Sequence, residues 1–130
     1  MPQLRISDAS RLLGVSDDTL RRWVEAGRLR AGTGDSGRKV VDGADLARLA
    51  QELAEEPTDG SVRESARNRF RGIVTKVTKD TVMAQVDMQC GPFRVVSLMS
   101  REACDDLGLE PGVVTVASVK STQVVVEVPT

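Results

Sequence analysis

The sequence predicts an α+β chain of two domains, in which a small helical domain precedes a five-stranded β-barrel. Apolar residues recur at helical spacing within the first 54 residues, and they alternate with polar residues from residue 73 onward. Between these halves the segment 55–61 is polar and acidic and contains Pro57 and Gly60. We therefore expect a helical domain at residues 1–54, a linker at 55–63 and a β domain at 64–130.

The composition excludes several functional classes. The net charge of −1 gives no overall attraction to nucleic acid, so DNA binding would need a local basic patch. The chain has no histidine, which removes the commonest general base and the commonest metal ligand, and we expect neither an enzyme nor a protein-ligated metal site. Cys90 and Cys104 lie in no C-x-x-C motif and are expected to be buried thiols. Without a leader or a membrane-spanning run, a cytoplasmic protein is expected.

Two short helices are predicted near the N-terminus. Ser7 is a suitable cap for a helix over 8–13, in which Leu12 belongs to the apolar stripe, and Gly14 ends it. Ser16 is a suitable cap for the second helix, and Gly27 ends it. Two helices joined by a short Gly-containing turn form the helix-turn-helix pattern. The inner stripe of the second helix is expected to be Leu20, Trp23 and Val24.

Polar and basic side chains of the second helix avoid this stripe, as they do in a recognition helix. A Gly-rich turn at 32–37 then joins two short β-like pieces and precedes a basic pair, which indicates a hairpin or wing, and Asp42 is a suitable cap for a third helix. The candidate DNA contacts are Ser16, Thr19, Arg21, Arg22, Arg38 and Lys39.

Three pieces of this region carry a family resemblance: 14–16, 19–23 and 26–29. They resemble the winged helix-turn-helix of the excisionase and MerR-like group over about residues 4–54. The resemblance implies binding of double-stranded DNA. Val40 stands where the group commonly has an aromatic residue, which leaves the groove contacts of the wing open. The alternative is a small helical domain used for protein contacts.

The second half alternates with a period of two, which is typical of half-buried strands. Turns are expected at Lys79–Asp80 and Gly91–Pro92, and Ser100 is a suitable cap for a short helix over 101–107. The last two strands are expected at 113–120 and 124–128. Five short strands with one late helix predict a small barrel of the OB type, which is expected to need a partner subunit to complete its core.

Two strand ends carry cations next to hydroxyls. Ser65 and Arg67 stand where the first strand opens, and Lys120 and Ser121 stand where the fourth ends. A forked guanidinium with nearby hydroxyls suits a tetrahedral oxyanion, so the two stretches could meet around one. The alternative is a solvated basic edge formed with Arg69 and Arg71.

Four stretches, 65–68, 100–102, 107–112 and 119–121, resemble the Mop domain, also called TOBE, over residues 64–128. The resemblance implies molybdate or tungstate bound between the subunits of a dimer or hexamer. Ala103 stands where the family often has serine, so the number of hydroxyls around the anion stays open. The family's ligands would fall on Ser65, Ala66, Arg67, Asn68, Ser100, Lys120 and Ser121.

Three functions can be weighed on this basis. A transcriptional regulator that responds to molybdate or tungstate would use both domains. An intracellular oxyanion store would use the second domain, with the first helping assembly. Binding of RNA or single-stranded DNA by the barrel is disfavoured, because such proteins stack bases on aromatic side chains and the aromatic content here is 2%.

Overall fold

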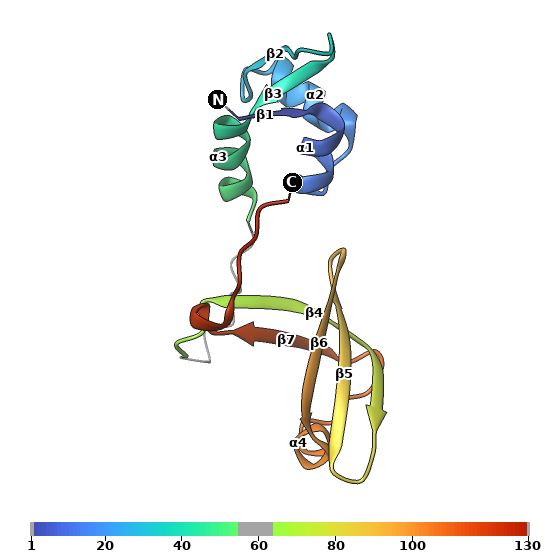
Figure 1. The fold of residues 1–130 in the computed structure, drawn as a ribbon. Coiled ribbons are helices and arrows are strands. Elements are labelled where there is room, and N and C mark those ends of the chain that lie inside the picture. The colour runs from blue at the N-terminus through green and yellow to red at the C-terminus, as the bar shows by residue number, and fades with distance from the viewer. Residues whose placement is uncertain (1, 55–63, 130) are drawn as a thin grey trace. The chain divides into compact units, whose positions relative to one another are not determined.

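The computed structural model describes residues 2–54 and 64–129. The chain separates into two compact units, Met1–Glu56 and Pro57–Thr130 (Figure 1). The segment 55–63, expected to be a linker, lies outside the described residues. The two units are therefore considered separately below.

The first unit packs three helices against a small antiparallel sheet. The strands are β1 (Gln3–Arg5), β2 (Ala31–Thr33) and β3 (Lys39–Asp42), with β3 in the middle. The helices are α1 (Ile6–Leu13), α2 (Asp17–Glu25) and α3 (Gly43–Leu53). Their apolar faces meet around Leu20 and Val41, which are fully buried, and Trp23 and Val24 pack against this core as the sequence predicted.

Two of the predicted helix caps in this unit are confirmed, and one is wrong. The Ser16 hydroxyl accepts the backbone N–H of Thr19 at 3.1 Å, and the Asp42 carboxylate accepts that of Asp45 at 3.0 Å. Ser7 caps nothing, because β1 runs directly into α1 and Arg5 occupies the cap position without a side-chain bond. Leu12, expected in the apolar stripe, is 70% exposed.

The second unit is a curled four-stranded antiparallel sheet in the order β6-β5-β4-β7. Its elements are β4 (Asn68–Lys79), β5 (Met83–Cys90), β6 (Phe93–Ser100), α4 (Arg101–Asp106), β7 (Val114–Val119) and the 3₁₀ turn η1 (Ser121–Gln123). The first half of β4 pairs with β7 and the second half with β5, so this one strand joins both sides of the sheet. Ser100 caps α4 as predicted, accepting Ala103 N–H at 3.1 Å.

Apolar side chains at alternate positions of the strands bury one face of this sheet. Val74, Val86 and Met88 point inward and form the core with Cys90 and Cys104, whose predicted burial as free thiols is confirmed. Figure 1 shows β5 and β6 as a long hairpin with α4 at its lower end. The inner face therefore lies between this hairpin and the β4–β7 pair.

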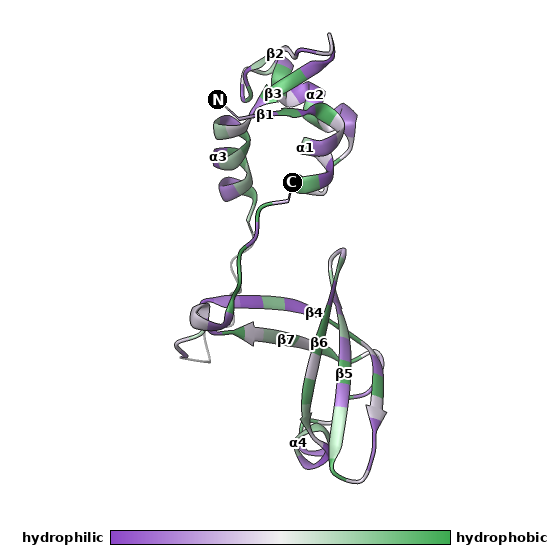
Figure 2. Cartoon of the chain, in the orientation of Figure 1, coloured by the Kyte–Doolittle hydropathy of each residue, from purple (hydrophilic) through white to green (hydrophobic). Residues whose placement is uncertain are grey.

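The predicted fifth strand at 124–128 does not form. After η1 the chain continues without strand pairing, and Val125, Val126 and Val128 are 91%, 85% and 84% exposed. Figure 2 shows this apolar (green) tail beyond the red 3₁₀ turn of Figure 1. A strand needs a partner edge, and the described part of this single chain does not pair one with the tail.

Candidate functional sites

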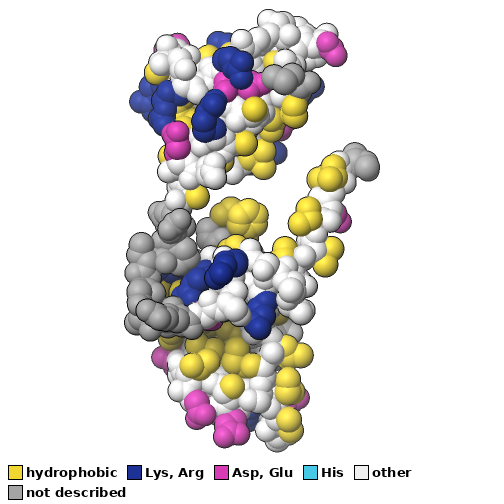
Figure 3. Space-filling view, turned by 90° about the vertical axis from the view of Figure 1, so that its left-hand side faces the viewer, with side chains coloured by type: hydrophobic (Ala, Val, Ile, Leu, Met, Phe, Trp, Pro, Cys, Tyr) yellow, Lys and Arg dark blue, Asp and Glu magenta, His cyan; other side chains and the backbone are white. Residues whose placement is uncertain are grey.

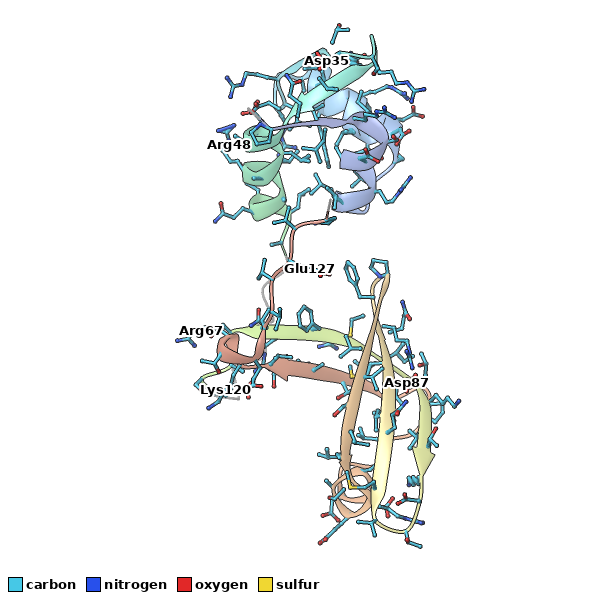
Figure 4. The ribbon with its side chains drawn as sticks, in the orientation of Figure 1. Asp35, Arg48, Arg67, Asp87, Lys120 and Glu127 are labelled. Carbon is cyan, nitrogen blue, oxygen red and sulfur yellow. The ribbon has the colours of Figure 1, made fainter. Side chains whose placement is uncertain are left out.

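Strand pairing brings the two predicted cation-and-hydroxyl stretches to one end of the second unit. Asn68, the first residue of β4, pairs with Val119, the last residue of β7, and its side-chain amide donates to the Val119 carbonyl at 3.2 Å. Arg67 and Lys120 are the residues next to this pair. Figure 4 shows both at the same end of the β4–β7 ribbon.

The side chains at this end are accessible. Ser65, Arg67, Lys120 and Ser121 are exposed, whereas Ala66 and Asn68 are half-buried. Among the described residues neither Arg67 nor Lys120 forms an ion pair, whereas the neighbouring Arg69 pairs with Glu64. Figure 3 views this end and shows basic side chains (dark blue) above an apolar surface (yellow). Within the described residues, these two cations therefore keep their charge and their hydrogen-bond donors accessible to solvent.

Ser100, the remaining predicted ligand, lies elsewhere. It pairs with Met83 at the opposite end of β5 from the β4–β7 site, and the next residue, Arg101, donates its N–H to the Val82 carbonyl at 2.8 Å. One chain therefore does not bring Ser100 to Arg67 and Lys120. Sequence periodicity could not show this, because it does not say which strand ends are neighbours.

An apolar groove of about 430 Å³ runs along the inner face between β6 and β7, the two edge strands of the sheet. Inner side chains of β5, β6 and β7 line it, together with Leu107 and Leu109 after α4. The sequence did not predict this groove, because five strands were expected. With only four strands in the described part of the unit, the space between β6 and β7 stays open. Its apolar lining between two edge strands is suited to the side chains of an additional strand.

The predicted DNA contacts on α2 share one surface. A shallow hollow of about 580 Å³ is lined by Ser16, Asp18, Arg21, Arg22 and Glu25, and Thr19 is half-buried beside it. Ser16 and Thr19 begin the helix, where a recognition helix meets base edges. Arg21 donates to the Asp18 carboxylate at 3.4 Å, and Arg22 donates to the Thr19 hydroxyl at 3.0 Å.

Arg38 and Lys39 are exposed on the β2–β3 hairpin. The hairpin closes through bonds from Gly34 N–H to the Arg38 carbonyl and from Gly37 N–H to the Gly34 carbonyl, at 2.8 and 2.9 Å. Gly37 has φ +76°, which favours glycine in this turn. The basic pair is thus presented on one arm of a short ribbon.

The sequence did not reveal the role of Asp45 of α3, whose carboxylate binds Arg30 at the start of this hairpin. Asp45 is 4% exposed and accepts the backbone N–H and the side-chain Nε of Arg30, at 2.9 and 3.0 Å, and it also pairs with Arg48. The Arg30 side-chain bond, followed by its backbone bond, lowers the pKa of Asp45 far below its usual range. The helix-start spacing Asp42-x-x-Asp45 was the available signal, but it did not reveal Arg30 as the partner.

No group of carboxylates and thiols in the described residues is arranged to hold a metal ion. No helix in the part of the chain described here is long and apolar enough to cross a membrane.

Comparison with known proteins agrees with this division. Residues 4–54 match the helix-turn-helix domain family, and residues 64–126 match the TOBE domain family. Molybdenum-pterin-binding protein 3 of Clostridium pasteurianum is 38% identical over 63 residues, which are 48% of this chain and 93% of the relative. Molybdenum-pterin-binding protein 2 of the same organism is 35% identical over the same shares.

Among solved structures, the cytoplasmic molybdate-binding protein ModG, in a form with molybdate bound, is 27% identical with a TM-score of 0.51. The match covers 72% of this chain and 78% of that one. The protein therefore combines a helix-turn-helix domain with a TOBE domain. Through its TOBE domain the chain belongs to the family of molybdenum-pterin-binding (Mop) proteins.

Proposed function

We propose that this protein is a transcriptional regulator that binds molybdate or tungstate at subunit interfaces of its TOBE domain and double-stranded DNA through a winged helix-turn-helix. The observation that carries this proposal is that one chain has both exposed arginines on α2 and, at the β4–β7 end, exposed cations and hydroxyls brought together by strand pairing. The proposed role is binding and regulation rather than catalysis, in the cytoplasm, as the similarity to ModG supports.

The chemistry of the anion site supports a tetrahedral oxyanion. Arg67 offers two parallel N–H donors, Lys120 a second cation, and Ser65 and Ser121 hydroxyls. The backbone from Ala66 to Asn68 enters the strand beside them. These side chains are exposed in the single chain, so a second subunit would exclude water and strengthen each bond. The names of the similar proteins, which refer to molybdenum or molybdate, support this choice of anion.

A shared site also explains the position of Ser100. Because its own chain holds it away from Arg67 and Lys120, its contribution would come from another subunit. The site would then form only in the assembled protein, as a dimer or a hexamer.

The open groove and the unpaired tail support such an assembly. Val124, Val126 and Val128 lie on one side of an extended segment and Val125 and Glu127 on the other. The tail of a second copy, inserted between β6 and β7, would bury the first side in the groove and pair both edge strands. This exchange would supply the missing fifth strand and hold the shared anion sites together.

On the DNA side, α2 would enter the major groove while Arg38 and Lys39 grip the backbone from the hairpin. One recognition helix gives limited affinity, so two copies from one oligomer would bind paired half-sites. Anion binding between subunits would change the spacing of these helices. The storage function remains the second candidate, and it is favoured by the curated relatives, which match only the β domain. A store, however, has no need for the two exposed arginines of α2.

Calorimetric titration of the full-length protein with molybdate, tungstate and sulfate tests the anion site. Molybdate and tungstate should bind and sulfate, as the control, should bind more weakly. Lys120→Ala and Arg67→Ala should each lose a charge-assisted bond worth about 1.5–3 kcal/mol. Arg71→Ala, an exposed arginine further along β4, is the matched control and should bind like the wild type. Wild-type affinity in both site variants would contradict the proposal.

A further inference from the structure

Two neighbouring arginines of α2 lie in different chemical surroundings. Each is exposed, and each bonds to the residue three positions earlier. Arg21 donates to the carboxylate of Asp18, whereas Arg22 donates to the neutral hydroxyl of Thr19. The sequence made the two equivalent candidates for reading a base, and the structure distinguishes them.

The Thr19 hydroxyl is fixed by the helix cap. Its oxygen lies 2.9 Å from the Ser16 hydroxyl, which also accepts the Thr19 backbone N–H at 3.1 Å. A chain of hydrogen bonds therefore runs from the start of α2 through Thr19 to the guanidinium of Arg22. This chain orients Arg22 toward the N-terminal end of the helix, where base edges are reached.

Arg22 also keeps enough free N–H donors to read a base. Its hydrogen-bond partner is a neutral hydroxyl and occupies one of five N–H donors, whereas guanine is read by two donors to O6 and N7. A guanidinium that is already oriented loses less conformational entropy on binding. Arg21, in contrast, must leave the Asp18 carboxylate or carry that negative charge toward the phosphates.

We propose that Arg22 is the guanine-reading residue of this protein and that Thr19 is the positioning residue that orients it. Arg21 takes no part in guanine recognition. Once it leaves Asp18, its cation contributes sequence-independent attraction to the backbone. This inference rests on the proposed DNA-binding function and deepens it by naming the base that the operator must present.

The test uses the full-length protein and a duplex from the promoter region of its own gene. Single replacement of each guanine by 7-deazaguanine removes the N7 acceptor and leaves base pairing intact. At one guanine of each half-site the replacement should weaken wild-type binding by about 5- to 150-fold. Arg22→Ala should bind the normal and the replaced duplex equally, and Arg21→Ala should weaken both by the same factor.

Thr19→Val removes the hydroxyl and keeps the branched shape, and it should reduce the discrimination between the two duplexes. Thr19→Ser should restore it, and thermal unfolding followed by Trp23 fluorescence verifies that both variants fold. Full discrimination in Arg22→Ala, or in Thr19→Val, would overturn the corresponding assignment. If the wild type binds no sequence specifically, the proposed function itself fails. If the wild type binds specifically, but the losses caused by Arg22→Ala and by 7-deazaguanine simply add, only this inference is overturned.

Discussion

Gly72 of β4 packs closely against the end of β5. A Cβ atom there would stand 2.4 Å from the Gln89 carbonyl oxygen and 2.6 Å from the Cys90 sulfur, closer than backbone and a buried thiol allow. Gly72→Ala should therefore destabilise the second unit by about 1–3 kcal/mol, as overpacking does. Chemical denaturation followed by far-UV circular dichroism measures this. Gly32→Ala, with no atom within 4 Å of its Cβ, is the control, and equal stability of the two variants would refute this account of the close packing.

Asp45 makes the first unit sensitive to acid. Because Arg30 lowers the pKa of this carboxyl in the folded state, the unfolded chain takes up its proton at a higher pH than the folded chain does. Its stabilisation is complete above the unfolded pKa of about 3.8 and is lost as the pH falls toward the folded value.

Asp45→Asn should therefore be less stable than the wild type at neutral pH and should lose less on acidification to pH 3. Urea denaturation followed by the fluorescence of Trp23, which packs on the core of this unit, gives the measurement. Asp18→Asn, whose carboxylate is 90% exposed, is the control. An acid response in Asp45→Asn as steep as that of the wild type would show that other groups cause it.

At the scale of elements, the C-terminal tail distinguishes a folded monomer from an exchanged strand. Val125 and Val126 are 91% and 85% exposed in the single chain, so a monomer would tolerate a charge equally at both. Insertion between β6 and β7 would bury Val126 and leave Val125 outside. Val126→Asp should therefore dissociate the oligomer in sedimentation experiments, whereas Val125→Asp should not. Identical behaviour of the two variants would argue against exchange.

Local signals predicted the elements that depend on local bonds. Ser16, Asp42 and Ser100 were assigned as caps from sequence and are caps, since a cap acts within one helical turn. β1 was missed because three residues carry no usable periodicity, and the wrong cap at Ser7 followed from that omission. The prediction of a strand at 124–128 was wrong, because the alternation of apolar and polar residues indicates the two faces of a strand and not its partner.

The same limit applies to the candidate sites: the sequence indicates residue types, but not which distant segments lie side by side. The residue types around Arg67 and Lys120 indicated an anion, but only the β4–β7 register places the two stretches side by side. The β5–β6 register, in turn, leaves Ser100 at the other end of β5. Arg21 and Arg22 were recognised as outward-facing from the helical period, whereas their different partners required side-chain geometry.

For the whole molecule, the division into two compact units predicts independent behaviour. A fragment of residues 62–130 should still assemble and should bind molybdate with the affinity of the full chain, because the proposed anion ligands and the tail all lie within it. Sedimentation and calorimetry of the fragment provide the measurement. A monomeric fragment that does not bind would mean that the first unit is required for assembly.

The central claim is that anion binding controls DNA binding, and fluorescence anisotropy with the promoter duplex of the protein's own gene tests it most directly. The titration is carried out without anion, with molybdate, with tungstate and with sulfate as control. We expect sequence-specific binding whose affinity changes with molybdate or tungstate and not with sulfate, and whose response disappears in Lys120→Ala. Lys39→Ala should weaken all duplexes alike and reduce the salt dependence by about one unit. Anion binding without any sequence-specific DNA binding, in either condition, would contradict the regulator and favour the store.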